Sequence, residues 1–296
     1  MPLPVRFGRY ELQGLLDEGG EWHVYEAVDR TTGRDVAVKI LTTIDGNHDE
    51  ERKRRFLQGA RLAVSIQHDN VIPVYDYGEE QGYPFLAVEL SRGADLPDAI
   101  RNGHTGDAAN RTRIAFEAAR ALEFVHQRGI IHGEIGPENI FLEQSGRAKL
   151  LYFGITQSKY ADLCHAGCLD WQPAPRVVAN ERLCSWFILT PPEQLTGCAA
   201  VTPRTDVYRF GMVLYELFSG VKPWNGATLA RLYSVVLHEM PEVQPLVAAG
   251  TPRPVVELIY RCLAKKPEER LQSLGAIVEV LREVLLALDA GRNRAD

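Results

Sequence analysis

Four residues of one segment have side chains that are common zinc ligands. Cys164, His165, Cys168 and Cys184 offer three thiols and an imidazole. Structural zinc sites usually combine two close ligand pairs, whereas this segment has the C-x-x-x-C spacing of Cys164 and Cys168 without a second close pair. The spacing therefore favours ordinary thiols, with zinc binding as the alternative.

A phenol stands at an unusual place in the stretch LLYFG, residues 150–154. The stretch resembles a short apolar strand that runs into an aromatic residue and a glycine. Its middle residue, Tyr152, has a side chain with a pKa near 10, so the phenol is neutral at neutral pH. Because Mg²⁺ prefers carboxylate and phosphate oxygens, Tyr152 would be a very weak ligand for it.

Composition limits the class of protein. The 296 residues are 45% hydrophobic and 24% charged, which is typical of a globular chain with one large domain or two lobes. A net charge of −6 argues against a broad nucleic-acid surface. The chain has no apolar run of the roughly 18 residues that span a bilayer, and its start lacks a signal-peptide pattern. Five cysteines do not suggest a disulfide framework, so we expect a cytoplasmic protein.

The first part of the chain is rich in strand-forming segments. Short runs of Val, Tyr and Leu between Gly or Asp turns predict five strands of an antiparallel sheet, at residues 9–16, 22–29, 35–41, 71–78 and 83–90. One helix interrupts them, over residues 48–66. Together these elements predict a small sheet lobe over residues 1–92.

The periodicity becomes helical after Gly93. A helix is predicted over residues 113–129, with Gly129 as its C-cap. Further helices are predicted at residues 205–220, 228–240, 254–266 and 275–288. The expected architecture is therefore α+β, with a larger helical lobe over residues 93–296. A ligand-binding cleft is expected between the two lobes.

Six ordered stretches carry a family resemblance. They are VAVK (36–39), IIHGEIGPENIFL (130–142), YFG (152–154), PPEQ (191–194), DVYRFGMVLYELFSG (206–220) and KKPEERL (265–271). The chain resembles a eukaryotic-like protein kinase domain, most closely the bacterial serine/threonine kinases, over residues 10–285. The resemblance implies a bilobal fold with a five-stranded N-terminal sheet and helix C, followed by a mainly helical lobe. Both lobes would form one kinase-like domain.

The phosphate-binding loop departs from the family pattern G-x-G-x-x-G. Its three glycine positions hold Asp17, Gly19 and Trp22. A carboxylate at Asp17 would repel a triphosphate, and the indole of Trp22 would occupy space needed by the phosphates. Gly19 alone is a weak signal, because a hairpin turn explains it equally well.

Lys39 matches the family's strand lysine, which contacts the α and β phosphates. The glutamate that pairs with this lysine falls at Gly59 in our register. Glu51, the nearest preceding acid, lies eight residues away, roughly 12 Å along a helix. The usual ion pair cannot form. An ordinary strand lysine that reaches solvent is the alternative for Lys39.

The catalytic loop HGEIGPEN departs from the family form H-R-D-x-K-P-x-N. His132 and Asn139 match, whereas Gly133, Glu134 and Gly136 replace the arginine, aspartate and lysine. Glu134 moves the carboxylate of the base by one methylene and would be a poor base. Loss of the lysine removes a charge that stabilises the transition state. Loss of the arginine removes the usual receptor of an activation-loop phosphate.

Tyr152 takes the place of the metal-binding aspartate of the family's DFG turn, so the resemblance implies that Mg²⁺ binds poorly. The phenol would fill or gate the cleft. Other positions match the family's architecture, with Asp206 anchoring the catalytic-loop backbone and Glu193 pairing with Arg270. The matching architectural set is His132, Phe153, Gly154, Glu193, Asp206 and Arg270.

ATP binding stays open in this interpretation. The resemblance places Val24, Ala37 and Phe141 around an adenine, with backbone hydrogen bonds from Glu89 and Ser91. The alternative is that these side chains pack the cleft shut against Trp22 and Tyr152.

Two functions follow from this pattern. The first is a pseudokinase, a catalytically impaired binding module that docks a protein partner such as an active kinase or another signalling protein. The second is a weakly active atypical serine/threonine kinase that transfers the ATP γ-phosphate, with Glu134 as base and Asn139 holding one metal ion. Neither function involves nucleic acid or a membrane segment.

Overall fold

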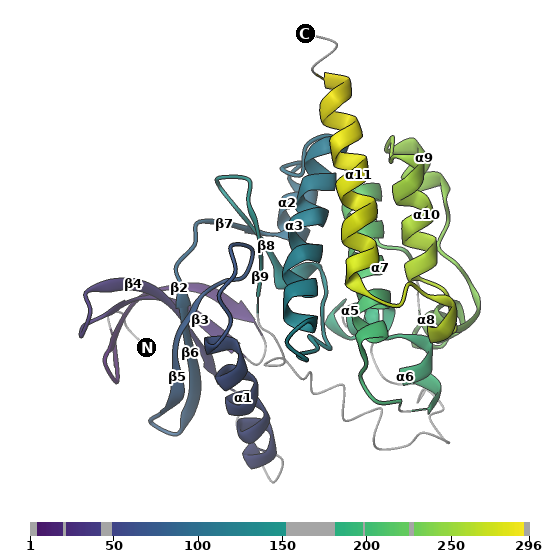
Figure 1. The fold of residues 1–296 in the computed structure, drawn as a ribbon. Coiled ribbons are helices and arrows are strands. Elements are labelled where there is room, and N and C mark those ends of the chain that lie inside the picture. The colour runs from purple at the N-terminus through teal and green to yellow at the C-terminus, as the bar shows by residue number, and fades with distance from the viewer. Residues whose placement is uncertain are drawn as a thin grey trace. The chain divides into compact units, whose positions relative to one another are not determined.

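The computed structural model describes residues 5–19, 22–42, 49–151, 181–197, 199–224 and 228–292. The chain forms two compact units (Figure 1). The first comprises Met1–Gly93 and Leu151–Gln157, and the second comprises Ala94–Leu150 and Ser158–Asp296.

The first unit contains an antiparallel sheet with strand order β1-β2-β3-β4-β6-β5. Its strands are β1 (Val5–Phe7), β2 (Tyr10–Gly19), β3 (Trp22–Asp29), β4 (Arg34–Leu41), β5 (Val74–Glu80) and β6 (Tyr83–Glu89). The sheet therefore has six strands where the sequence predicted five. The additional strand, β1, has three residues and pairs Phe7 with Tyr10, which is too short for a periodic pattern to identify.

Strand β4 shows why this sheet is buried on both faces. Val36, Val38 and Ile40 join one apolar cluster, together with Phe7, Tyr10 and Phe85. The alternate residue Ala37 joins a second cluster on the opposite face. The continuous apolar sequence VAV thus corresponds to a strand that is covered on both sides.

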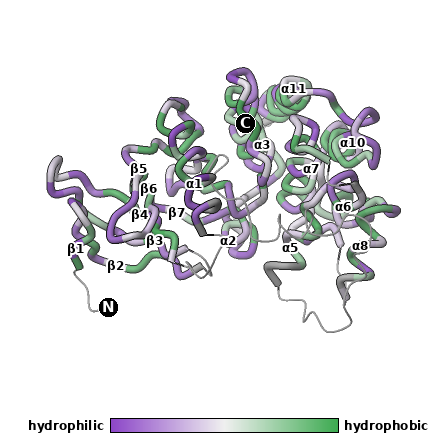
Figure 2. The backbone as a smooth tube through the Cα atoms, turned by 90° about the horizontal axis from the view of Figure 1, so that it is seen from below, coloured by the Kyte–Doolittle hydropathy of each residue, from purple (hydrophilic) through white to green (hydrophobic). Residues whose placement is uncertain are grey.

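Helix α1 (Asp49–Val64) covers the second face. It contributes Phe56, Ala60 and Ala63 to the second cluster, with exposed fractions of 3% or less. Hydrophilic residues occupy much of the rest of α1 (Figure 2), as expected for a helix that buries one narrow face. The predicted range 48–66 is thus close to the observed helix.

The second unit is mainly helical, with a three-stranded sheet of order β7-β8-β9. Its strands are β7 (Gly93–Asp95), β8 (Ile140–Glu143) and β9 (Ala148–Leu150). Its helices are α2 (Leu96–Arg101), α3 (Ala108–His126), α5 (Glu181–Leu189), α6 (Pro192–Gly197), α7 (Pro203–Ser219), α8 (Leu229–His238), α9 (Gln244–Ala248), α10 (Arg253–Cys262) and α11 (Leu274–Arg292). Two short 3₁₀ turns, Pro137–Asn139 and Pro267–Glu269, complete it.

Helix α7 lies at the centre of this unit and is buried along almost its whole length. It packs against α3 and α10, and α11 packs against α3 (Figure 1). Gly211 permits the close approach of α10, because a Cβ there would lie 2.7 Å from the Cβ of Cys262. Gly220 ends the helix in the left-handed conformation, as a C-terminal glycine commonly does.

Helix α3 differs from its predicted bounds at both ends. It begins at Ala108, where the Asp107 carboxylate accepts a hydrogen bond from the backbone of Asn110. It ends at His126, and its C-cap is Gln127 rather than Gly129. Gly129 has a φ of +70° and belongs to the turn that follows.

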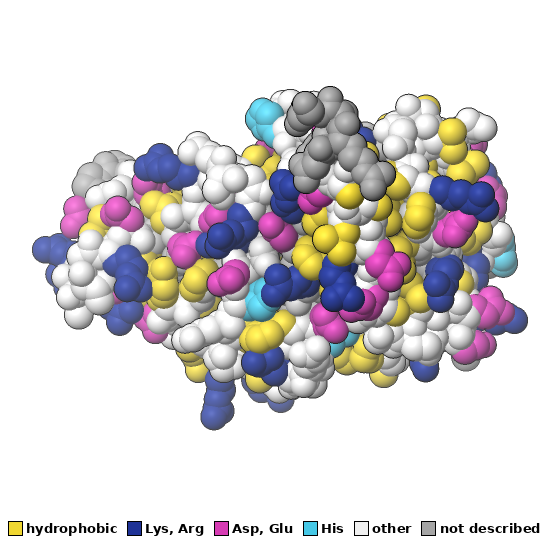
Figure 3. Space-filling view, turned by 45° about the horizontal axis from the view of Figure 1, so that its top comes forward, with side chains coloured by type: hydrophobic (Ala, Val, Ile, Leu, Met, Phe, Trp, Pro, Cys, Tyr) yellow, Lys and Arg dark blue, Asp and Glu magenta, His cyan; other side chains and the backbone are white. Residues whose placement is uncertain are grey.

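Charges of both signs are interspersed on the face shown in Figure 3. In the part of the chain that the structure describes, no helix combines the length and the apolar character needed to cross a bilayer.

Lys265 carries a pH-dependent contribution to stability in the second unit. Its ammonium group donates to the carbonyl of Val236 at 2.7 Å, at the end of α8, and lies 4.8 Å from the centroid of the Trp224 ring. Burial, with a smaller contribution from the charge of Arg270, lowers the pKa of Lys265 from 10.5 to about 8. The amine is therefore harder to protonate in the folded chain than in the unfolded chain.

Between pH 8 and 10.5 the unfolded state consequently binds more protons at Lys265 than the folded state does. This residue's contribution to the free energy of unfolding should therefore rise with pH over that interval. Urea unfolding of the wild type and of Lys265→Met at several pH values tests this. The free energy of unfolding of the wild type minus that of the variant should increase from pH 8 to 10. A difference that does not change with pH would contradict the lowered pKa of Lys265.

Candidate functional site

Lys39 lies on β4 with only 6% of its surface exposed. Its register neighbours are Val24 on β3 and Leu86 on β6. Val24, Ala37 and Leu86 all belong to the cluster beneath α1. The structure thus brings Lys39 together with two of the three residues that the sequence assigned to an adenine pocket.

Gly59 is buried within α1, one helical turn from Phe56 and Ala63. These two side chains pack on the cluster that also contains Val24 and Ala37. The helix position that the family gives to glutamate therefore faces the sheet in this chain and carries no side chain. After Glu51, α1 contains no acidic residue.

Trp22 is the first residue of β3 and pairs with Gly19 of β2 and Leu41 of β4. The centroid of its ring lies 4.7 Å from the Lys39 ammonium and 5.1 Å from the centroid of the Phe56 ring. Asp17 is exposed and pairs with Val24 in the same hairpin. Residues 17–19 of β2 and 22–24 of β3 therefore pair antiparallel, and the Trp22 indole contacts the lysine.

The end of β6 and the segment that follows it contain the predicted hinge residues Glu89 and Ser91. The backbone N–H of Glu89 donates to the carbonyl of Pro73 at 3.0 Å. The hydroxyl of Ser91 donates to the Glu89 carboxylate at 2.9 Å. Phe141 belongs to the second unit, where it is half-buried on β8 and pairs with Lys149.

The catalytic-loop segment of the second unit is held by Asp206, a fully buried residue of α7. The Asp206 carboxylate accepts hydrogen bonds from the backbone N–H groups of His132 and Gly133, both at 2.8 Å. His132 is itself only 2% exposed. The structure thus brings Asp206 to the loop backbone, where the family resemblance placed it.

His126 forms a further hydrogen bond with this carboxylate, and the sequence did not predict that contact. Its Nε2 atom lies 2.7 Å from Oδ2 of Asp206. Because an ionised carboxylate only accepts, Nε2 must carry the hydrogen. The sequence signal that could have indicated this contact is the place of His126 in the last turn of α3, four residues after the buried Leu122.

Two glycines shape the backbone of the loop. Gly133 has a φ of +78°, a conformation that other residues adopt at a cost, and a Cβ there would lie 3.3 Å from the Cγ1 atom of Val201. A Cβ at Gly136 would lie 2.7 Å from both carboxylate oxygens of Glu138. The Glu138 carboxylate therefore lies beside the position where the family carries a lysine side chain.

Glu134 and Asn139, the two loop residues proposed to serve chemistry, differ in their burial. Glu134 is half-buried, and its backbone N–H lies 3.4 Å from Nδ1 of His132. Asn139 is 5% exposed and closes the 3₁₀ turn by donating its N–H to the carbonyl of Gly136. The Asn139 amide matches the ligand that the family uses, whereas by sequence the second position is the phenol of Tyr152, so the two residues together do not fit Mg²⁺ in the family manner.

Glu193 and Arg270 form a buried bidentate ion pair, with N···O distances of 2.8 and 2.6 Å. The Arg270 side chain is completely buried, and its remaining donors bind the carbonyls of Ala264, Arg204 and Lys265. Every N–H group of this guanidinium therefore has an acceptor. The pair connects α6 to the segment before α11.

Several predicted site residues lie outside the described residues, namely Tyr152, Phe153, Gly154, Cys164, His165 and Cys168. Cys184 is described and is a half-buried free thiol on α5. Among the residues that the structure describes, no group of three or more His, Cys, Asp or Glu side chains is placed to bind a metal ion.

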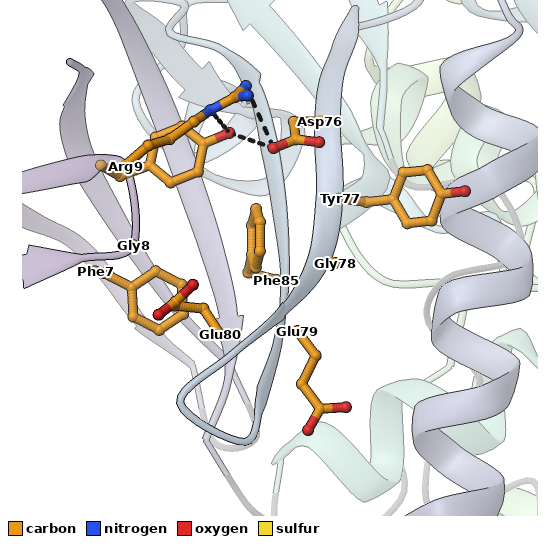
Figure 4. A pocket seen from close by; sticks show the side chains of 10 residues that line it. Phe7, Gly8, Arg9, Asp76, Tyr77, Gly78, Glu79, Glu80 and Phe85 are labelled. Carbon is orange, nitrogen blue, oxygen red and sulfur yellow. Dashed lines mark hydrogen bonds and ion pairs between the residues drawn. The ribbon is translucent and has the colours of Figure 1, made fainter. Parts of the chain in front are cut away.

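A cavity of about 360 Å³ lies in the first unit (Figure 4), and Lys39 is not among the residues that line it. The turn between β1 and β2, strand β5 and Phe85 line it. On one side the Arg9 guanidinium and the Tyr10 hydroxyl meet the Asp76 carboxylate, at 3.3 and 2.8 Å. Phe7 and Phe85 belong to the cluster on the face of the sheet opposite α1, so this cavity is not the predicted nucleotide pocket.

Comparison with known proteins identifies the family. A protein kinase domain model matches residues 10–283. The serine/threonine-protein kinase PknA of Mycobacterium tuberculosis is 31% identical over 282 residues, which are 94% of this chain and 61% of that protein. PknH of the same organism is 31% identical over 284 residues, which are 94% and 42% of the two chains. The DNA damage-responsive serine/threonine-protein kinase RqkA of Deinococcus radiodurans is 33% identical over 286 residues, with 92% and 39% covered.

The fold agrees with this assignment. A crystal structure of a mutant form of the Mycobacterium tuberculosis PknI kinase domain matches with a TM-score of 0.71 and 22% identity, covering 96% of this chain and 98% of that one. The chain spans between 39% and 61% of the length of the three curated relatives named above. On the strength of the model match and these identities, the chain belongs to the protein kinase domain family, with its α+β fold.

Proposed function

We propose that this chain is a pseudokinase, a catalytically impaired kinase domain that acts as a binding module in signalling or scaffolding. The observation that carries the proposal is the contrast within the catalytic loop. Asp206 accepts hydrogen bonds from the backbone N–H groups of His132 and Gly133, and His126 bonds to the same carboxylate. The loop that begins there nevertheless carries Gly133, Glu134 and Gly136 where the family has arginine, aspartate and lysine. The support for the loop is intact, while the groups that would do chemistry are replaced.

The first unit supports the same proposal independently. The buried face of α1 has Gly59 at the position where the resemblance expects the glutamate of the family. An ATP molecule, when bound, would use Lys39 for its phosphates and Val24, Ala37 and Phe141 around the base. Mg²⁺ would be held weakly, since Asn139 keeps the amide of the family but Tyr152 stands where the family uses a carboxylate.

The function is then to dock a protein partner, such as an active kinase or another signalling protein, in the cytoplasm. Residues 1–92 and 93–296 form the two lobes in this proposal. Although the relatives are named as serine/threonine kinases, this chain uses their architecture without efficient phosphate transfer.

A radiometric transfer assay tests the proposal. The pure chain, with ATP, Mg²⁺ or Mn²⁺ and a general protein substrate, should transfer no more phosphate than Lys39→Ala does. The kinase domain of PknA serves as the positive control. Mg²⁺-dependent transfer that Lys39→Ala abolishes would overturn the proposal in favour of a weakly active kinase, as would a Tyr152→Asp variant whose activity exceeds a measurable wild-type rate.

Thermal-shift measurements with ATP give a second test of the proposal. Ligand at a hundred times its Kd adds about 2.7 kcal/mol of stability to a protein. Any stabilisation by ATP should be the same with and without Mg²⁺. A shift that requires Mg²⁺ would show that the metal site is functional.

A further inference from the structure

The cavity that the turn between β1 and β2, strand β5 and Phe85 line has the size of a small-molecule pocket (Figure 4). Two of its glycines make room for the side chains that form its wall. A Cβ at Gly8 would lie 2.7 Å from Oε2 of Glu80, and a Cβ at Gly78 would lie 3.3 Å from Cε1 of Phe85. Glycine at these two positions therefore lets a carboxylate and an aromatic ring stand at the edge of the cavity.

Aromatic rings form one wall of the cavity. Phe7 and Phe85 meet edge to face, with ring centroids 5.6 Å apart and planes at 89°. Tyr10 meets Phe85 in a similar way, with centroids 5.5 Å apart. All three residues are at most 8% exposed, so the core fixes their positions. An apolar group of a ligand can pack on such a wall, and the face of an aromatic ring also attracts a cation.

The polar groups at one end of the cavity have their partners within the protein. The Arg9 guanidinium lies 3.3 Å from the carboxylates of both Asp29 and Asp76. The Tyr10 hydroxyl donates to Asp76 at 2.8 Å and accepts from Nε of Arg9 at 3.1 Å. The positive charge of Arg9 therefore has two counter-charges, and this end of the cavity needs no ligand to satisfy it.

Glu80 is the half-buried carboxylate of the cavity and lies beside the ring of Phe7 (Figure 4). Among the residues that the structure describes, none donates a hydrogen bond to this carboxylate or forms an ion pair with it. The neighbouring Glu79 differs in this respect, because its carboxylate lies 3.5 Å from the ammonium group of Lys53. Glu80 is thus the carboxylate of the lining that is available to a ligand.

The charges of the lining select the kind of ligand. Three carboxylates, of Asp76, Glu79 and Glu80, line the cavity together with the guanidinium of Arg9. The excess of negative charge favours a cation over an anion. We propose that the cavity is a binding site for a small organic cation, whose amidinium, guanidinium or ammonium group pairs with Glu80 while its apolar part packs on the aromatic wall.

Benzamidine is a probe of this class, because it joins a planar amidinium to a phenyl ring, and benzamide is a neutral molecule of nearly the same shape. In NMR titrations of the isotopically labelled chain, benzamidine should shift the backbone amide signals of Gly8 and Gly78 and saturate in the millimolar range. Benzamide should bind about tenfold more weakly, because it lacks the charge that strengthens hydrogen bonds to a carboxylate. Equal binding of the two probes, or unchanged signals of both glycines, would overturn the proposal.

Glu80→Gln removes the negative charge and keeps the size of the side chain. This variant should bind benzamidine about tenfold more weakly than the wild type. Glu79→Gln is the matched control and should bind within about twofold of the wild type, because the Glu79 carboxylate already pairs with Lys53. An unchanged affinity in Glu80→Gln, or an equal loss in Glu79→Gln, would refute the pairing with Glu80. The comparison of benzamidine with benzamide uses the wild type alone, so it decides the matter even when a variant does not fold.

Lys39→Ala distinguishes this cavity from the kinase-like site. Lys39 does not line the cavity, so the variant should bind benzamidine as the wild type does. Loss of binding in folded Lys39→Ala would place the probe at the kinase-like site and would overturn the proposal. These titrations contain no ATP and measure no phosphate transfer, so their outcome and that of the pseudokinase proposal are independent.

Discussion

Replacing Asp206 with alanine should lower the free energy of unfolding of the chain by about 3–5 kcal/mol. The carboxylate is fully buried and accepts hydrogen bonds from three donors, the N–H groups of His132 and Gly133 and Nε2 of His126. Each donor that loses its acceptor in the interior costs about 1–3 kcal/mol, reduced where water can enter. Urea denaturation followed by far-UV circular dichroism, which reports mainly the helical second unit, measures the loss.

Asp107 offers a matched comparison for this result. Its carboxylate caps α3 through one backbone hydrogen bond, to Asn110 at 3.0 Å. Removal of such a cap typically costs about 1 kcal/mol. If Asp107→Ala and Asp206→Ala destabilised the chain equally, the central role of Asp206 in holding the loop would be wrong. Asp206→Asn, which keeps one acceptor oxygen, should fall between the two.

The second large effect is expected at the ion pair of Glu193 and Arg270. Glu193→Ala should cost about 3–5 kcal/mol, because it leaves the fully buried Arg270 guanidinium without a counter-charge. The ring of Tyr208, 4.8 Å from the guanidinium carbon, and three backbone carbonyls remain as partners but do not neutralise the charge. Thermal and urea unfolding should both report the loss.

The exposed pair of Arg253 and Glu257 provides the control, with an N···O distance of 2.9 Å and side chains 91% and 61% exposed. Glu257→Ala should change stability by less than about 0.5 kcal/mol, because solvent screens this attraction. A double variant, Glu193→Ala with Arg270→Met, should be more stable than Glu193→Ala alone, since it removes the unpaired charge. If the double variant were the less stable of the two, desolvated charge would not be the cause of the loss.

The parts of this chain that sequence predicted well are those in which one local pattern determines the outcome. The runs around Val36 and Phe85 predicted strands because apolar β-branched and aromatic residues filled them, and the kinase motifs predicted the fold. The contacts of Asp206 with the loop and of Glu193 with Arg270 are present in the structure because the family architecture around them is retained. The order and spacing of family motifs can predict such contacts even when the two residues are far apart in the sequence.

Other features depend on tertiary contacts that no local pattern encodes. The hydrogen bond between His126 and Asp206 joins residues of two different helices. No sequence motif fixes the spacing between the histidine and the aspartate. Trp22 was predicted to take up space, but its contact with Lys39 depends on the register of β3 against β4. Strand β1 is defined by its pairing with β2 rather than by its three residues.

Gly133 makes it costly to introduce arginine at this position of the loop. Its φ of +78° suits glycine, and a larger residue there would incur about 1–2 kcal/mol of backbone strain and would crowd Val201. Restoring arginine at this position would therefore begin with a penalty, before any benefit from the other replaced positions could appear. An attempt to engineer kinase activity into this chain would therefore gain from relieving the backbone strain at residue 133 before arginine is introduced there.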